Sequence, residues 1–569
     1  MLCLRKGWLG AARRRNTRYG RASCAVRRSR PLRPQAGQGR RAALRVAGTV
    51  LAAIAFVTVA TSCTDAPQPV QPPHARLAAR THLPASATSV LAGAANVVAG
   101  SLAESLFASA PVVVVAGPGR SAELAAARSA QRAHAPLLLA SAGPDRAEAG
   151  GATGRAVRTA AQIGTGRSSG PAGVVTALLR AQIEALDPRA VLAVGMAGNV
   201  QAAHLPGIHV VTDPAMLPAT KAPSPLGRLA LLVHPGDSDA ATLAAVTTAR
   251  VAGARVIAVR GADPRADPAA IAALSAARPR QVLAIGTGFG SAAQLASRVA
   301  VAQTGVQLPG GGQILFPGRL LVALYGHPGA PSLGVLGEQG LSATIARARK
   351  VATAYRALSK VPVIPALEII ATVAQARPGR DGAYSYQSTV ASLRPWVRRA
   401  TAAGMYVILD LQPGRASLLA QARSYRSLLQ MPDVGLALDP EWKLTPHQLP
   451  LHQIGSVSIS EVNGVIGWLA GLTARHRLPQ KLLVLHQFRL SMIGDEHQLD
   501  TRHHDLAILI HMDGQGTRAD KEQTWQAVTR VAPAGVVFGW KNFYVKDHPM
   551  MSPQQTIATT PQLSMISYQ

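Results

Sequence analysis

Short unbroken runs of Val, Leu, Ile and Ala alternate with longer alanine-rich stretches over residues 87–305. Continuous apolar runs of this length are typical of strands whose two faces are both covered, and the stretches between them fit helices. This pattern predicts an α/β structure with a parallel sheet. The expected strands are 112–116, 136–140, 190–194, 208–211, 229–233, 255–259 and 281–285.

A second series of strand-like runs follows a change in composition near residue 310. Residues 301–318 contain Pro309 and three successive glycines, and 17 of the 22 aromatic residues lie after residue 310. The expected strands are 320–325, 362–367, 405–409, 434–438, 481–485, 506–510 and 535–539. Seven β/α units in about 250 residues predict a TIM-type barrel. An eighth strand is not evident, which leaves open whether the barrel is complete.

The positive charge of the chain is concentrated at its N-terminus. The formal net charge is +31, but residues 1–45 hold 14 Arg and Lys and no acid, which leaves +17 for the rest. Aromatic residues make up only 4% of the chain and do not alternate with basic stretches, as a base-stacking surface would require. We therefore expect no nucleic-acid partner.

The N-terminal segment has the features of an export signal. Arg40, Arg41 and Arg45 precede an uncharged apolar run that ends in Ala-Thr-Ser-Cys at Cys63. A positive segment, a short apolar run and small residues before the cleavage point form a secretory signal. With cysteine at that point the segment resembles a bacterial lipoprotein signal, which implies a lipid on Cys63 and a place on the outer face of the cell membrane. A transmembrane anchor is the alternative, although the run is shorter than the roughly 20 residues that a span needs.

These features divide the chain into five parts. We expect a signal peptide at 1–63, a Pro-rich tether at 64–86, a repeated α/β module at 87–305, a Gly/Pro linker at 306–318 and a barrel at 319–569. Cys3, Cys24 and Cys63 are the only cysteines, so the mature chain has no thiolate for a disulfide or metal site beyond Cys63. We expect no metal and no cofactor.

The α/β module repeats internally. PRAVLAVG at 188–195 matches PRQVLAIG at 279–286, and a strand, glycine turn and alanine-rich helix precede each copy. These segments resemble type 2 cell-wall-binding repeats of actinobacteria and clostridia, with Ala135-Pro136 and the late glycines Gly195 and Gly286 in the matching places. The resemblance implies that the module binds a cell-wall polymer.

Polar residues follow nearly every expected strand of the barrel. Because parallel strands all end on one side of a barrel, these residues should open onto one face. We expect a substrate-binding mouth lined by Tyr325, His327, Glu368, Asp410, His486, Asp513 and Trp540, with Asp439 and Glu441 as catalytic residues.

Asp439 and Glu441 form the most specific motif of the barrel. Residues two apart on a strand point the same way, so both carboxyls should face the mouth. Neighbouring carboxyls hinder each other's ionisation, and one that keeps its proton can act as a general acid. The segment GLALDPEW resembles the fourth-strand motif of chitinase-like and muramidase-like barrels. That resemblance implies that Glu441 is the acid and Asp439 its support. We expect Glu441 to be the more buried of the two, with a raised pKa, and Asp439 to stay ionised.

These predictions point to a lipid-anchored surface protein whose glycosidase-like barrel acts on, or recognises, a cell-wall or environmental glycan. Two alternatives stay open. The barrel can be a non-catalytic lipoprotein domain that binds a polymer or small ligand, in which case an Arg ion pair should hold Glu441. Residues 87–305 can also be a sensor with a polar ligand cleft between the repeats.

Overall fold

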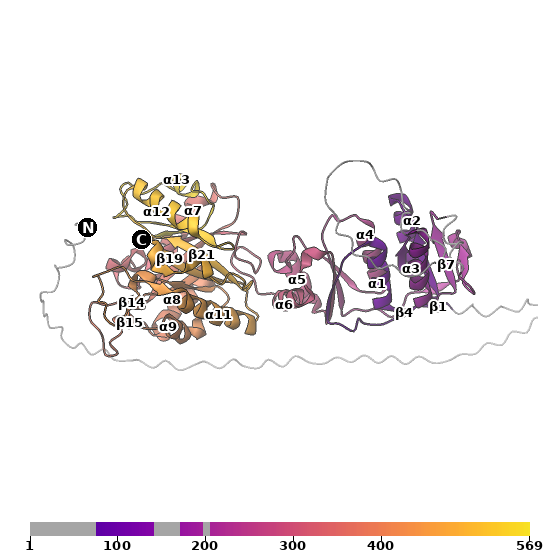
Figure 1. Ribbon diagram of the computed structural model, residues 1–569, viewed down its shortest axis with the longest axis horizontal. Coiled ribbons are helices and arrows are strands. Elements are labelled where there is room, and N and C mark those ends of the chain that lie inside the picture. The colour runs from indigo at the N-terminus through magenta and orange to yellow at the C-terminus, as the bar shows by residue number, and fades with distance from the viewer. Residues whose placement is uncertain (1–75, 141–170, 197–204) are drawn as a thin grey trace, which may run out of the picture. The chain divides into compact units, whose positions relative to one another are not determined.

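The computed structural model describes residues 76–140, 171–196 and 205–569 (Figure 1). The predicted signal peptide, Cys63 and tether residues 64–75 lie outside the described residues. None of the helices in the described ranges is both long and apolar enough to cross a bilayer.

Two four-stranded parallel sheets form the first region, in the orders β6-β5-β7-β8 and β11-β10-β12-β3. All seven strands expected here are present. The strands are β3 (Thr88–Leu91), β5 (Val112–Ala116), β6 (Leu137–Leu139), β7 (Ala190–Val194), β8 (His209–Val211), β10 (Leu229–Val233), β11 (Arg255–Ala258) and β12 (Gln281–Ile285). The helices are α1 (Ala95–Leu106), α2 (Arg120–Arg132), α3 (Pro171–Ala185), α4 (Ala240–Val251), α5 (Pro268–Ala277) and α6 (Ala292–Ala302).

The two repeated segments have the same strand order. In each, the first strand lies between the second and the third, with Val112 beside Ala190 in one sheet and Leu229 beside Gln281 in the other. The fourth strand differs in origin, since β8 follows its sheet in the chain whereas β3 comes from the N-terminal side. The wall-binding resemblance of these segments stays a prediction.

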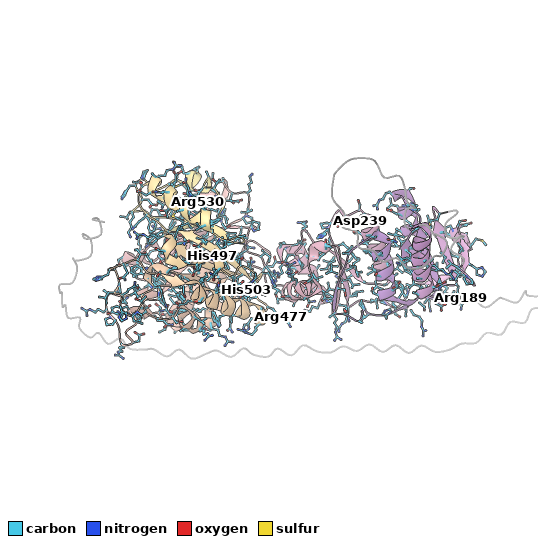
Figure 2. The ribbon with its side chains drawn as sticks, in the orientation of Figure 1. Arg189, Asp239, Arg477, His497, His503 and Arg530 are labelled. Atoms are coloured by element: carbon cyan, nitrogen blue, oxygen red, sulfur yellow. The ribbon has the colours of Figure 1, made fainter. Side chains whose placement is uncertain are left out.

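An apolar core joins the two sheets. It contains Val98 and Leu102 of α1 and Ala245 and Ala249 of α4, together with residues from both sheets. The N-cap of α4 is Asp239, which is labelled in Figure 2. Its Oδ1 accepts a hydrogen bond from the Thr242 amide at 2.9 Å. Packed helices between the sheets do not favour the sensor interpretation, which required a polar cleft there.

Two expected boundaries differ in the structure. Within the predicted tether, β1 (Leu77–Ala78) pairs with β9 (Thr220–Lys221), and β2 (Arg80–Thr81) pairs with β4 (Phe107–Ser109). The folded module thus begins before residue 87. Residues Leu308, Leu315 and Phe316 of the expected linker are buried in the apolar cluster inside the barrel.

Eight parallel strands close into a barrel. Its strands, in order around the barrel, are β13 (Leu320–Gly326), β14 (Val363–Ala374), β16 (Tyr406–Leu411), β17 (Val434–Leu438), β19 (Lys481–Gln487), β21 (Leu506–Met512), β22 (Val537–Asn542) and β23 (Leu563–Tyr568). Pairing of β13 with both β14 and β23 closes the ring. The expected TIM-type barrel is confirmed and is complete, because β23 is the eighth strand.

Helices surround the barrel strands. They are α7 (Leu341–Arg356), α8 (Val390–Ala402), α9 (Leu418–Ser424), α10 (Arg426–Leu429), α11 (Ile459–Arg475), α12 (Arg518–Val531) and α13 (Pro553–Ile557). Figure 1 shows α7, α12 and α13 on one side of the strands and α8, α9 and α11 on the other. Short strands β15 (Ser385–Gln387), β18 (Val457–Ser458) and β20 (Ile493–Gly494) lie in the loops that follow β14, β17 and β19.

Candidate functional site

A layer of buried polar side chains occupies the C-terminal end of the barrel. Each of the eight strands, or the residue just after it, contributes one: Tyr325, Glu368, Asp410, Asp439, His486, His511, Lys541 and Ser567. Contacts between them join strands that are not neighbours, so these side chains point into the barrel. Below the layer the barrel is filled by apolar side chains such as Leu321, Ile408 and Val484.

His486 lies at the centre of this layer. Its Nε2 is 2.9 Å from Glu368 Oε1 and 3.9 Å from Asp410 Oδ1, and its Nδ1 is 3.1 Å from Asp513 Oδ2. Burial alone would lower the His486 pKa, but the negative charge of Glu368 and contact with Asp513 raise it well above its ordinary value. His486 is therefore an imidazolium held between carboxylates.

Asp410 is bound by a tyrosine from two strands away in the barrel. Tyr325 donates its hydroxyl to Asp410 Oδ2 at 2.8 Å, and Gln412 donates to the Tyr325 hydroxyl at 3.2 Å. Burial raises the pKa of Asp410 to about 6, although His486 opposes this shift. Asp410 is thus ionised at neutral pH and takes up a proton in mild acid.

The expected pair Asp439 and Glu441 reaches the layer, but not along one strand. Strand β17 ends at Leu438, and Glu441 lies in a 3-10 turn (Pro440–Trp442). The order of burial is the reverse of that expected, because Asp439 is 1% exposed whereas Glu441 is half-buried. The premise of two carboxyls on an extended strand was wrong, although both side chains lie near the same group of charges.

The protonation of this pair also differs in part from the expectation. Burial, then the charge of Asp513, raises the pKa of Glu441 to about 7, as expected in direction. Burial, then the charges of Glu441 and Asp410, raises the pKa of Asp439 well above its usual range. The expectation that Asp439 stays ionised was wrong, because Tyr325 and His486 bond to Asp410 and Glu368 instead.

Among the charged groups around Glu441, Asp513 has the largest effect on the Glu441 pKa. Burial would raise its pKa, but contact with His486 and the charge of Lys541, whose Nζ is 4.0 Å away, lower the pKa below the ordinary value. Lys541 Nζ also lies 3.4 Å from the centre of the Tyr325 ring. Glu441, which keeps its proton below about pH 7, is therefore under the influence of a carboxylate, Asp513, that stays ionised.

Two other predicted residues have different surroundings. Trp540 does not face the mouth: it is fully buried in the outer core, where its ring contacts Trp525 at 5.7 Å, and its Nε1 donates to Asn542 Oδ1. Alternation along β22 points Lys541, rather than Trp540, into the barrel. His327 lies in the loop after β13, where its Nδ1 contacts the Ile370 carbonyl at 2.9 Å.

Three members of the layer were not predicted from the sequence. His511 follows the expected strand 506–510 and contacts Ser567 Oγ through Nε2 at 2.7 Å, and burial lowers its pKa well below the usual value. Ser567 lies on the strand that was not recognised. Lys541 was adjacent to the chosen Trp540, and alternation along the strand was the signal that distinguishes them.

Fold and polar layer together define the C-terminal region as a complete TIM-type barrel with acidic and basic groups buried at the C-terminal end of its strands. In the described ranges, no group of three or more His, Cys, Asp or Glu side chains is arranged to hold a metal ion. A scan against family models finds no match to the chain, and no curated protein matches it.

Proposed function

We propose that the barrel is a glycoside-hydrolase-like domain that acts on a cell-wall or environmental glycan, with Glu441 as the proton donor. One observation carries this proposal: at the C-terminal end of the barrel strands, burial and the charge of the ionised Asp513 raise the pKa of Glu441 to about 7. Glycoside cleavage uses a pair of carboxyl groups in these two protonation states.

In the proposed reaction Glu441 gives its proton to the glycosidic oxygen as the bond to the anomeric carbon breaks. Asp513 then either attacks that carbon or removes a proton from the water that does, and the carboxyl separation in the substrate complex decides which. Asp439 stays neutral and donates a hydrogen bond, since its raised pKa keeps it protonated. His486 keeps Asp513 ionised by its contact and its charge.

The environment of Glu441 supports an enzyme over a passive binding domain. A binding domain was expected to hold Glu441 in an Arg ion pair, yet across the described ranges no Arg or Lys nitrogen comes within 4.0 Å of its carboxylate. Glu368, Asp410, Asp439 and Asp513 each keep one buried oxygen with no hydrogen-bond partner in the part described. Unpaired buried oxygens cost stability, and their retention fits a functional role for the layer.

We also propose that the chain is a lipoprotein anchored through Cys63 on the outer face of the membrane, with the α/β module as a wall-polymer-binding part. The support is the residues alone: the apolar run before Cys63 and the matched PRxVLAxG segments. An anchored barrel would meet glycans of the cell wall or of the medium.

A hydrolysis screen of the full chain tests the proposed activity. Purified protein is incubated with cell-wall and environmental polysaccharides, and new reducing ends are measured. We expect turnover of at least one glycan that Glu441→Gln lowers by about 10²–10⁴-fold. The matched control is Glu522→Gln, which removes an exposed carboxylate that pairs with Arg518 on α12 and should leave turnover unchanged. Glycan binding without turnover in the parent chain would instead assign the barrel to the binding class.

A further inference from the structure

The surface charge of the barrel is distributed unevenly. Residues 341–432 contain 13 Lys and Arg and three acids, and two of those acids, Glu368 and Asp410, are buried in the polar layer. Residues 433–569 contain 11 Lys and Arg and 12 acids. The net positive charge of the barrel thus lies on the helices that follow its first three strands.

Eight exposed bases form what we name the basic face: Arg349, Lys350, Arg356, Lys360, Arg398, Arg399, Arg423 and Arg426. They lie on or just after α7, α8, α9 and α10, and these helices contain no acidic residue. Within the described ranges, none of the eight has a carboxylate within 4.0 Å. Their charges are compensated only by solvent.

The helices of the basic face are neighbours around the barrel. Arg349 donates to the Ala403 carbonyl at the end of α8 at 2.6 Å, which joins α7 to α8. Arg394 donates to Ser427 Oγ at 3.3 Å, which joins α8 to α10. The eight bases therefore belong to one continuous outer surface of three successive β/α units.

The composition of this surface selects among anionic partners. Six of the eight bases are Arg, whose planar guanidinium matches two phosphate oxygens at once. Helices α7, α8, α9 and α10 expose no large apolar side chain, and Tyr386 on β15 is the single exposed aromatic side chain in the described residues 341–432. One such ring is too little to anchor the surface in a bilayer or to stack successive bases. Trp396, the single Trp in this stretch, packs against the barrel core and is not free to stack on a nucleobase.

We propose that the basic face binds a linear phosphodiester polymer without nucleobases, of the poly(glycerol phosphate) kind. The recognition is electrostatic, with arginine forks on successive phosphates, and its strength falls as salt concentration rises. This surface lies on the outside of the barrel, so it acts independently of the Glu441 site. It would hold the barrel against a polyanionic matrix while the mouth stays open.

The test measures binding of poly(glycerol phosphate) to the full chain over a range of salt concentrations. The basic-face variant is Arg398→Gln, Arg399→Gln, Arg423→Gln and Arg426→Gln together. The control variant removes the same charge from exposed positions outside the basic face: Arg475→Gln, Arg477→Gln, Arg502→Gln and Arg530→Gln. Figure 2 labels two of them, Arg477 and Arg530. All chains share the basic N-terminal segment, so its contribution cancels.

We expect the basic-face variant to lose at least about tenfold in affinity near 0.1 M salt. The slope of log affinity against log salt should fall by roughly 3, since each lost phosphate contact removes about 0.7. In the control variant, the changes in affinity and in the salt slope should each be no more than about a third of those in the basic-face variant. Equal losses in the two variants would overturn the proposal. Tighter binding of a single-stranded DNA of equal phosphate number, or binding only to phosphatidylglycerol vesicles, would overturn it in favour of nucleic acid or membrane.

Discussion

At the scale of single residues, the polar layer keeps carboxyl groups in an environment that opposes their charge. Burial raises the pKa of Asp410, Asp439 and Glu441, and the cations His486 and Lys541 offset this only in part. A fold gains nothing in stability from such an arrangement, and such groups concentrate at functional sites. Because these pKa shifts make the free energy of unfolding depend on pH, the layer can be tested by stability measurements alone.

Replacing Asp439 with Asn should stabilise the protein at high pH. A carboxyl whose pKa is raised in the folded state keeps its proton there, so stability is lost as pH rises from about 4 through the folded-state pKa. Asn does not ionise, so we expect Asp439→Asn to exceed the parent by about 1 kcal/mol at pH 8 and to match it near pH 4. Thermal unfolding at several pH values measures this, with Asp495→Asn, an exposed carboxyl, as the control. A difference that does not vary with pH would contradict the assigned environment of Asp439.

The residue scale also shows why the site was predicted only in part. The residues that follow each expected strand could be identified from the sequence, so Glu368, Asp410, His486 and Asp513 were placed in the mouth. Protonation depends on partners from distant parts of the chain: Tyr325 bonds Asp410 and His486 bonds Glu368, across 85 and 118 positions. No local pattern could show that Asp439 is left without these partners.

At the scale of elements, strands with continuous apolar runs were found with close boundaries, such as 112–116 and 434–438. The eighth barrel strand was missed because its sequence, LSMISY, has Ser564 and Ser567 within the apolar run. The paired strands of the tether were missed because two residues are too few to show a pattern. Trp540 was assigned to the mouth because the end of β22 was expected one residue before it, whereas the strand continues to Asn542.

Trp540 provides a prediction about this element. Its ring packs on Trp525 of α12 and under Lys521 Nζ, 5.0 Å from the ring centre, so it attaches α12 to β22. We expect Trp540→Ala to cost about 3–5 kcal/mol in unfolding free energy, and Trp540→Phe clearly less. The folded fraction of Trp540→Phe should keep the glycan affinity of the parent. Loss of affinity in Trp540→Phe without loss of stability would show instead that the indole stacks on the ligand.

At the scale of the whole molecule, we assign separate roles to the N-terminal segment and to the folded regions. We propose that residues 1–63 direct export and provide the lipid anchor. We propose that the module binds the polymer and that the barrel binds the substrate. The class of each folded region followed from the sequence because parallel α/β units leave a strong periodic signal. The proposed function of the module rests on a resemblance alone, because no contact in the described residues supports it independently.

The anchor prediction concerns Cys63. If the segment is a lipoprotein signal, processing attaches a diacylglycerol to Cys63, and two acyl chains hold a protein stably on a membrane. We expect Cys63→Ala to stall the precursor or release the protein from the membrane fraction, and to abolish incorporation of labelled palmitate. A Cys63→Ala chain that is cleaved and still retained on the membrane would contradict lipid anchoring.

The central claim is that Glu441 donates the proton to the leaving group, and the dependence of turnover on the leaving group tests it most directly. The parent chain and Glu441→Gln are compared on a natural glycan and on an aryl glycoside of the same sugar whose dinitrophenolate leaves without protonation. We predict that Glu441→Gln lowers turnover of the glycan by about 10²–10⁴-fold and cleavage of the aryl glycoside by far less. Parent turnover should fall as pH rises through about 7, where Glu441 loses its proton. Equal losses on both substrates, or turnover that rises through pH 7, would contradict the claim.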